Sequence, residues 1–236
     1  MKPKLLDQCL IKLNIESIEE LIKKGADVNE IDSSGCSPLH YIHNKSIIKL
    51  LIDHGANVNI RDNRGRTPLF YYKSTETFEL LIRHGADVKI CDINGNTALH
   101  TDTDISTAQL LIAQGIDVNT RNVHNETPLF YAESVEFAEL LVTQGADINA
   151  RDNNGKNALD YSPKKLVKLF IYHGIVPSSV NIYQDYRDLF SEEQQKAFDT
   201  FQLITSNDED FYQMCLSYQN SVMHHAKINI QELDIL

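Results

Sequence analysis

A five-residue phrase recurs every thirty residues and constrains the fold of this chain more than any other feature. Its copies begin at Gly25, Gly55, Gly85, Gly115 and Gly145 and read Gly-Ala-Asp-Val-Asn with small variations. A fixed period of this length is typical of stacked supersecondary units, because one unit alone cannot bury its apolar face. The sequence therefore predicts a solenoid, and it favours a protein-binding surface over a catalytic centre.

Composition narrows the classes of partner. The 236 residues carry a formal net charge of −11, which disfavours DNA, RNA and anionic membranes because these are bound mainly by Lys and Arg. No apolar run approaches the roughly twenty residues of a membrane-spanning helix, and residues 1–7 lack the apolar stretch of a secretory signal. The four cysteines form no CxxC pair, as expected for reduced thiols. We expect a cytoplasmic monomer that binds protein, without nucleic acid, membrane insertion or cofactor.

The unit that begins at Asp62 shows the local logic of the repeat. Asp-x-x-Gly favours a tight turn in which Gly65 takes a positive φ. Thr67 suits a helix N-cap, and Pro68 suits the first helical position because the N–H that proline lacks would be unpaired there. The sequence therefore predicts a loop followed by a short first helix over residues 68–72.

A second, longer helix follows in each unit. In the same unit it is predicted over residues 75–84, and Gly85 ends it in the left-handed conformation. Its apolar residues recur at helical spacing, namely Phe78, Leu81 and Ile82, with Leu80 beside them.

These residues resemble the ankyrin repeat. The Gly-x-Thr-Pro-Leu-His core of that family is matched at residues 35–40, 65–70 and 95–100, by Thr127-Pro128-Leu129-Phe130, and in weaker form at 157–160. The resemblance covers residues 1 to about 176 and implies an all-α ankyrin-repeat solenoid of about six helix-turn-helix units. Their expected bounds are 1–31, 32–61, 62–91, 92–121, 122–151 and 152–176.

The repeat departs from the family in length. The family unit has about thirty-three residues, and the three that are missing here fall between the two helices. A shortened first helix and a tighter turn between the helices are expected in every unit. The fourth unit looks weak, because Asp102 and Asp104 stand where the first helix usually packs small apolar residues and Ile116 replaces an alanine. We expect fraying or bending there. The sixth unit, interrupted by Pro163, looks weak as well.

A non-repeat, acidic helical tail is predicted over residues 177–236. Ser191-Glu192-Glu193-Gln194 fits a capping box that opens a helix, with Ala197, Phe198, Phe201 and Ile204 on one face. A second helix begins near Asn207. Two interpretations stay open, a C-terminal helical cap on the last repeat or a module that recruits a partner. The signatures of F-box and SOCS-box segments are absent.

The sequence gives little support for a catalytic function. No HExxH, GxSxG, P-loop or GxGxxG motif is present, so no catalytic, metal-binding or cofactor-binding residue is predicted and the chain is expected not to be an enzyme. His40 and His100 occupy the histidine slot of the family core, where the resemblance implies a structural hydrogen bond. A small enzyme in the tail is a third hypothesis, which lacks a nucleophile–base pattern.

The loop tips are the best binding candidates, because the repeat frame leaves them free to vary. The basic ones, with Arg61 beside them, would suit an acidic patch on a partner. In four successive loops the candidates are Asn63, Arg64 and Arg66; Ile93, Asn94 and Asn96; Val123, His124 and Glu126; and Asn153, Asn154 and Lys156.

Two further sets of residues recur by position. Tyrosine occupies one slot of the short helix, and either forms a binding stripe, with Tyr71 and Tyr131 as candidates, or packs its ring with the hydroxyl at the surface. The asparagine that ends the repeated phrase is, by the resemblance to ankyrin proteins, a possible target of asparaginyl hydroxylase, or else its amide bonds the turn. These asparagines are Asn29, Asn59, Asn119 and Asn149.

The leading hypothesis is a non-enzymatic scaffold or adaptor that binds one folded protein through its loop tips and concave face. The alternative is a translocated effector of an intracellular bacterium, or a viral protein, that acts on a host protein and recruits a second partner through its C-terminal helices. The abundance of Ile and Asn, as in AT-rich genomes, suggests this alternative.

Overall fold

The structure is a computed structural model that describes residues 5–6, 14–101, 104–205 and 207–233, with side chains as far as Val222. It divides into two compact units, residues 1–123 and 124–236. Within the described residues every regular element is helical, as the all-α prediction requires. This division falls inside the repeats, so the expected boundary between repeats and tail at 176/177 stays a prediction.

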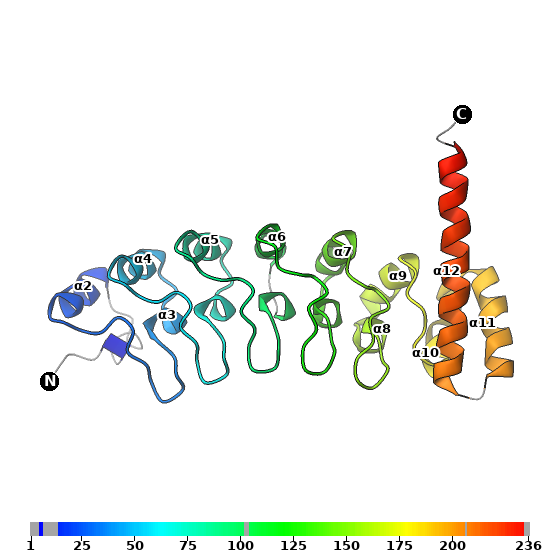
Figure 1. The fold of residues 1–236 in the computed structure, drawn as a ribbon, viewed down its shortest axis with the longest axis horizontal. Helices are drawn as coiled ribbons and strands as arrows, with labels where there is room; N and C mark the ends of the chain where they lie inside the picture. The colour runs from blue at the N-terminus through cyan, green and yellow to red at the C-terminus, as the bar shows by residue number, and fades with distance from the viewer. Residues whose placement is uncertain (1–4, 7–13, 102–103, 206, 234–236) are drawn as a thin grey trace. The chain divides into compact units, whose positions relative to one another are not determined.

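In the first unit a short and a long helix alternate, and the short elements lie between the loops and the long helices (Figure 1). The elements are α2 (Ile15–Lys23), α3 (Pro38–Tyr41), α4 (Lys45–Asp53), η1 (Pro68–Tyr71), α5 (Thr75–Arg83), η2 (Ala98–His100) and α6 (Ile105–Ala113).

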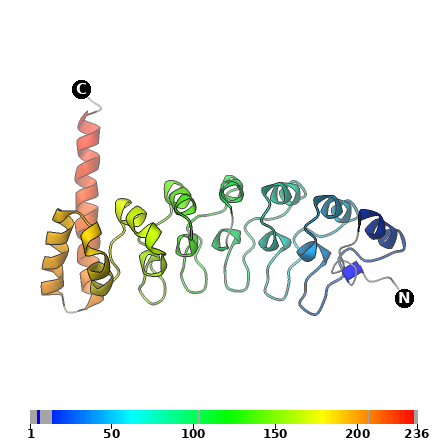
Figure 2. The same ribbon diagram turned by 180° about the vertical axis from the view of Figure 1, so that it is seen from behind.

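The second unit continues the alternation and adds the tail. Its elements are η3 (Pro128–Tyr131), α7 (Val135–Thr143), α8 (Ala158–Tyr161), α9 (Lys164–Tyr172), α10 (Val180–Tyr186), η4 (Arg187–Leu189), α11 (Glu192–Ile204) and α12 (Asp208–Leu233). In the view from behind, α11 and α12 lie side by side (Figure 2).

The prediction of a shortened first helix is confirmed. The short elements span three or four residues, and η1, η2 and η3 are 3₁₀ helices. A single turn leaves room for i→i+3 bonds but for few i→i+4 bonds. Three residues, Tyr72 to Ser74, separate η1 from α5.

Glycine ends each long helix of the repeats as predicted. Gly85 has φ +87°, a conformation that costs a residue with a Cβ atom free energy. Its N–H donates to the Ile82 carbonyl oxygen (2.9 Å), and the Ala86 N–H donates to the Leu81 carbonyl oxygen (3.0 Å). This pair of bonds is the Schellman motif, and it satisfies two carbonyl groups that the helix end would otherwise leave unpaired.

The interpretation of Asp104 as a misplaced packing residue is wrong. Asp104 is the N-cap of α6: its carboxylate accepts hydrogen bonds from the Thr107 N–H (3.0 Å) and from the Thr107 hydroxyl (2.7 Å). Such a cap stabilises a helix by about 1 kcal/mol. Ile116 is buried. Asp102 lies outside the described residues, and fraying of the fourth unit stays a prediction.

The sixth repeat forms both of its helices, with Pro163 as the N-cap residue of α9. Beyond it the tail encloses a core around Tyr183, whose ring packs against those of Phe190, Phe198 and Phe211. Helix α10, which carries Tyr183, is an element that the sequence analysis did not predict.

The capping box at Ser191 is confirmed, because Ser191 and Gln194 bond each other's backbone N–H groups through their side chains. The placement of Ile204 on the apolar face of α11 is wrong, since this side chain is 66% exposed at the C-terminal end of the helix. The tail also contacts the last repeats: the Tyr212 hydroxyl donates to the Asn149 carbonyl oxygen (3.1 Å).

Candidate protein-binding surface

An aspartate at the start of four of the five loops, at positions 32, 62, 92 and 152, holds the loop backbone in place. One carboxylate oxygen of Asp62 accepts the backbone N–H groups of Arg64 and Arg66, both at 2.8 Å. The Gly65 N–H donates to the Asp62 carbonyl oxygen (2.8 Å). This turn chemistry is the one that the sequence predicts, and it fixes the direction in which the tip residues leave the backbone.

Backbone hydrogen bonds connect each loop to the next one. In the first unit the Ile93 N–H donates to the Arg64 carbonyl oxygen (2.9 Å), and the Val123 N–H donates to the Asn94 carbonyl oxygen (2.8 Å). In the second unit Asn153 and His124 are related in the same way, at 3.0 Å. The tips therefore sit on a fixed backbone, which lowers the entropy that a partner would have to remove on binding.

The predicted tip residues differ in exposure. In the first unit the exposed ones form a row that we call the loop-tip row: Asn63, Arg64, Ile93, Asn94 and Val123. In the second unit the exposed ones are His124, Asn153, Asn154 and Lys156, and the predicted Tyr131 of the short helix is exposed as well. Half-buried positions are Arg66, Tyr71 and Asn96 in the first unit and Glu126 in the second.

Arg66 is held inside its own loop. Its guanidinium donates two hydrogen bonds to the second carboxylate oxygen of Asp62 (3.0 and 2.9 Å) and lies 4.6 Å from the ring centre of Tyr71. Asp62 is buried, so this ion pair compensates a charge that burial would otherwise penalise. Arg64, whose side chain is exposed, is the better candidate for contact with a partner.

The recurring tyrosines also bond the loop. The Tyr71 hydroxyl donates to Asp62, and the Tyr161 hydroxyl donates to Asp152 (2.7 Å). Burial of Asp62 favours the neutral acid, but hydrogen bonds from Tyr71 and Arg66 outweigh it and lower the pKa of Asp62. In the fifth repeat, where asparagine replaces this aspartate, the Tyr131 hydroxyl donates to Glu126 instead.

A cleft of about 390 Å³ opens among the loops of the first unit. The exposed side chain of Arg64 lines it together with Arg66 and Tyr71. The remaining lining residues are Ser33, Ser34, Cys36, Tyr41, Asp62 and Asn63.

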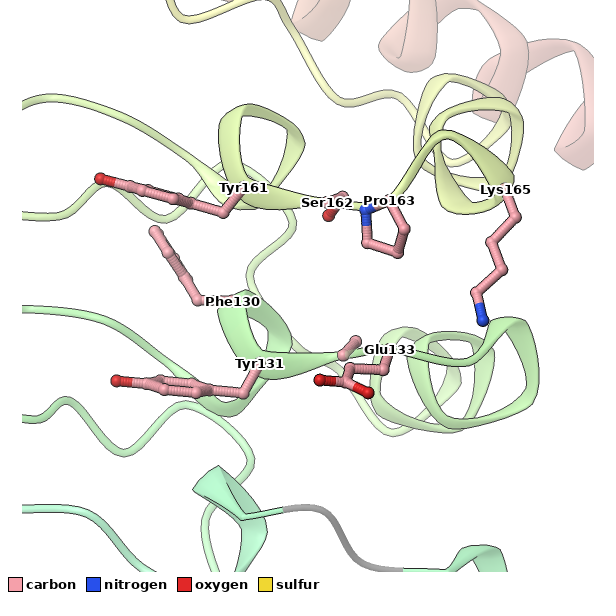
Figure 3. Close-up of a pocket in the computed structure, with 8 residues that line it drawn as sticks. Phe130, Tyr131, Glu133, Tyr161, Ser162, Pro163 and Lys165 are labelled. Atoms are coloured by element: carbon pink, nitrogen blue, oxygen red, sulfur yellow. The ribbon is translucent and has the colours of Figure 1, made fainter.

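A larger groove of about 520 Å³ lies in the second unit, between its two repeats (Figure 3). Sequence analysis singled out only Tyr131 among its lining residues as a binding residue. Glu133 and Pro163 occupy the same position in two successive repeats, two residues after the short helix, and both line the groove. This shared position is the sequence signal that could have indicated the groove. The full lining is Phe130, Tyr131, Ala132, Glu133, Tyr161, Ser162, Pro163 and Lys165.

The recurring asparagines connect successive repeats. Asn29 donates through its amide to the Gly55 carbonyl oxygen (2.9 Å) and accepts the Asn57 N–H (2.7 Å). Asn149 donates to the Gly174 carbonyl oxygen (3.4 Å). The amide thus hydrogen-bonds a turn, as the second interpretation expects, and this turn is the one that ends the long helix of the next repeat.

The other two asparagines occupy the same position. Asn59 makes the same two bonds as Asn29, and Asn119 donates its backbone N–H to the Asp117 carboxylate (2.8 Å). All four side chains are half-buried. Hydroxylation of them stays a prediction.

The described residues contain no group of three or more His, Cys, Asp and Glu side chains that could hold a metal ion. No helix in the same part of the chain is both long enough and apolar enough to cross a membrane. His40, one of the two histidines in the family slot, is buried, and its Nδ1 accepts the Ser37 N–H (2.9 Å). Burial lowers the pKa of His40, although a hydrogen bond with the Arg66 carbonyl oxygen acts in the opposite direction. These contacts give His40 a structural role.

Comparison with known proteins agrees with this geometry. A family model described as "Ankyrin repeats (3 copies)" matches residues 8–72, 44–122, 71–152 and 101–181. None of the curated proteins compared with the chain matches it. Among solved structures, the chain is similar to the ankyrin repeat domain of Bcl-3, described as a unique member of the IkappaB protein family, with 23% identity and a TM-score of 0.61. That match covers 74% of this chain and 87% of the other.

At this identity the structural likeness shows the fold, while the family model matches well over half of the chain. Ankyrin repeats generally mediate protein–protein interaction and are typically non-enzymatic. The chain belongs to the ankyrin-repeat family.

Proposed function

We propose that this chain is a non-enzymatic scaffold or adaptor that binds a folded protein through the loop-tip row of its first unit. The observation that carries the proposal is the exposure of two apolar side chains at equivalent positions of adjoining loops. Ile93 is 64% exposed and Val123 is 57% exposed. Exposed apolar residues grouped on one rigid surface favour a protein interface.

Charge adds specificity to this surface. Arg64 precedes Ile93 in the row, since the Ile93 N–H donates to the Arg64 carbonyl oxygen. An exposed arginine beside apolar side chains on a chain of net charge −11 favours a partner with an acidic rim around an apolar centre. The fixed loop backbone supports binding with little rearrangement.

The test is affinity capture with an Ile93→Asp/Val123→Asp variant beside the unchanged protein. Both side chains are exposed, so the fold should survive, and circular dichroism would check this. We expect the variant to lose the captured partner. A matched control is Leu203→Asp, which introduces the same chemistry at a side chain that is 86% exposed on the tail. Loss of the partner by the control alone would refute the loop-tip row as the site and place recognition on the tail.

A further inference from the structure

The groove of the second unit has the chemistry of a peptide site. Its aromatic wall consists of Phe130, Tyr131 and Tyr161, with Pro163 beyond it (Figure 3). Tyr131 is 38% exposed and Tyr161 is 46% exposed. The ring centres of Phe130 and Tyr161 lie 6.0 Å apart. Partly exposed aromatic rings present a large apolar area at a small entropic cost, which suits the docking of one apolar side chain.

Phe130 of the aromatic wall leaves a buried hydroxyl without a partner. In the fourth repeat His100, which occupies the position of Phe130, pairs with the Thr97 hydroxyl at 3.0 Å. Phe130 cannot pair with the equivalent hydroxyl of Thr127, which is 1% exposed and finds no hydrogen-bond partner among the described residues. An unpaired buried hydroxyl destabilises a fold. The same arrangement occurs in the third repeat, where Phe70 stands in the histidine slot and the buried Thr67 hydroxyl has no partner among the described residues.

Positive charge is grouped on α9, the helix that contributes Lys165 to the lining of the groove. Helix α9 begins with Lys164 and Lys165, carries Lys168 one turn later, and has no acidic residue in its first turn. Lysine at the positive end of a helix is unfavourable. All three side chains are exposed, and within the described residues no carboxylate lies within ion-pair distance of them.

Four lysines of the first unit, Lys23, Lys24, Lys45 and Lys49, are ion-paired. Lys23 bonds Glu19 at 2.9 Å, and Lys49 bonds Asp53 at 2.6 Å. The lysines on α9 differ from these in being unpaired and grouped within five residues of one helix, in a chain whose net charge is −11. It raises the local concentration of negatively charged segments near the groove.

The two sides of the groove differ in charge. Lys165 lines the side formed by the sixth repeat, and Glu133 lines the side formed by the fifth, both away from the tyrosine hydroxyls (Figure 3). A carboxylate of a bound segment is attracted toward Lys165 and repelled by Glu133. The charges thus select both the sign and the orientation of an occupant.

We propose that this groove binds an extended acidic peptide segment. A large apolar side chain of the segment lies on Phe130, Tyr131 and Tyr161, and its acidic residues lie along Lys164, Lys165 and Lys168. This groove is a second surface, separate from the loop-tip row, and the proposal states which chemistry its occupant has. It rests on the proposed function only because it takes the partner to be a protein.

The test is fluorescence anisotropy with a labelled synthetic peptide that has a central phenylalanine flanked by aspartates and glutamates. We expect saturable binding that weakens with salt, and that is lost when the phenylalanine becomes serine or the acids become lysines. A Lys165→Glu/Lys168→Glu variant should bind about tenfold more weakly. The matched control Lys196→Glu makes the same charge change on α11, where the side chain is also exposed, and should bind normally.

A second variant separates loss of binding from loss of folding. Phe130→His gives Thr127 the partner that Thr97 has, which offsets part of the apolar burial lost with Phe130. Circular dichroism should show that this variant is folded, while its peptide binding falls. The proposal is overturned if the acidic peptide does not bind, if the lysine-flanked or an uncharged proline-rich peptide binds equally well, or if Lys165→Glu/Lys168→Glu changes nothing.

The two proposals can fail separately. The Ile93→Asp/Val123→Asp variant should bind the peptide normally, because the groove is formed by residues 130–165 alone. Loss of captured partner by that variant without any peptide binding would leave the proposed function standing and refute the groove. Peptide binding, together with unchanged partner capture by the Ile93→Asp/Val123→Asp variant, would support the groove and refute the loop-tip row as the site.

Discussion

The side-chain amide of Asn59 joins two repeats by donating to the Gly85 carbonyl oxygen at 2.8 Å, while its oxygen accepts the N–H of Asp87 at 2.8 Å. Asn29 makes the equivalent pair of bonds one repeat earlier. Both groups of the amide are therefore used, which explains why asparagine recurs at this position: it is a donor and an acceptor at once.

Lys89 interrupts this series, and its replacement should stabilise the first unit. Lysine offers donors only, so it cannot accept the N–H of Asp117, the residue equivalent to Asp87. We expect Lys89→Asn to raise the free energy of unfolding by about 1 kcal/mol, measured by urea denaturation. The reverse change, Asn59→Lys, should lower it by a similar amount. Equal stability of Lys89→Asn and the original protein would contradict this account of the position.

Two threonines of the first unit should respond in opposite ways to the same substitution. Thr97 is bonded to His100, whereas the buried Thr67 hydroxyl has no partner among the described residues, since Phe70 stands in the histidine slot. Replacing an unpaired hydroxyl by a methyl group of the same shape removes a desolvation penalty of about 1–3 kcal/mol. Thr67→Val should therefore raise the melting temperature, and Thr97→Val should lower it. Parallel shifts would show that hydrogen bonding at this slot is not what distinguishes the repeats.

Much of the repeat could be predicted because its determinants are local. The backbone conformation at Gly85, at Pro68 and at the Ser191 capping box is determined within a single turn of chain, and it can be predicted from the residue types there. The short length of the first helices could be predicted from the number of residues between the repeated motifs. These elements needed no knowledge of distant contacts.

The features that the sequence did not show depend on contacts between distant residues. Tyr183 anchors α10 only because Phe198 and Phe211 reach it from two later helices. Arg66 looked like a free basic tip because its bond to a buried carboxylate becomes visible only when the loop closes. The groove between successive repeats combines Phe130 with Tyr161, and nothing in either local sequence reports their proximity.

Asp62 should give the first unit an acid-sensitive contribution to stability. Its folded-state pKa lies below the ordinary value of 3.8, so the stabilising effect is present above that value and is lost as the pH falls through the lowered folded pKa. Asp62→Asn should reduce stability at pH 7 and flatten the loss of stability between about pH 5 and pH 2. Urea midpoints across this range provide the measurement.

The matched control for this experiment is Asp188→Asn, which removes the same charge from a side chain that is 98% exposed. It should leave the pH profile nearly unchanged. A profile for Asp62→Asn that runs parallel to that of the original protein would mean that the loop carboxylate does not drive the acid sensitivity.

Helices α10 to α12 should stabilise the last repeat if they act as its cap. Phe198 is fully buried against Tyr183 and Phe211, and Ile171 of α9 packs against the same core. Phe198→Ala should cost about 3–5 kcal/mol and should also reduce the hydrogen-exchange protection of α9, because the two share one core. Ile204→Ala, at a side chain exposed on the same helix α11, should change stability by less than about 0.5 kcal/mol. Unchanged protection of α9 in Phe198→Ala would show that the tail folds independently, and would favour the interpretation of the tail as a recruiting module.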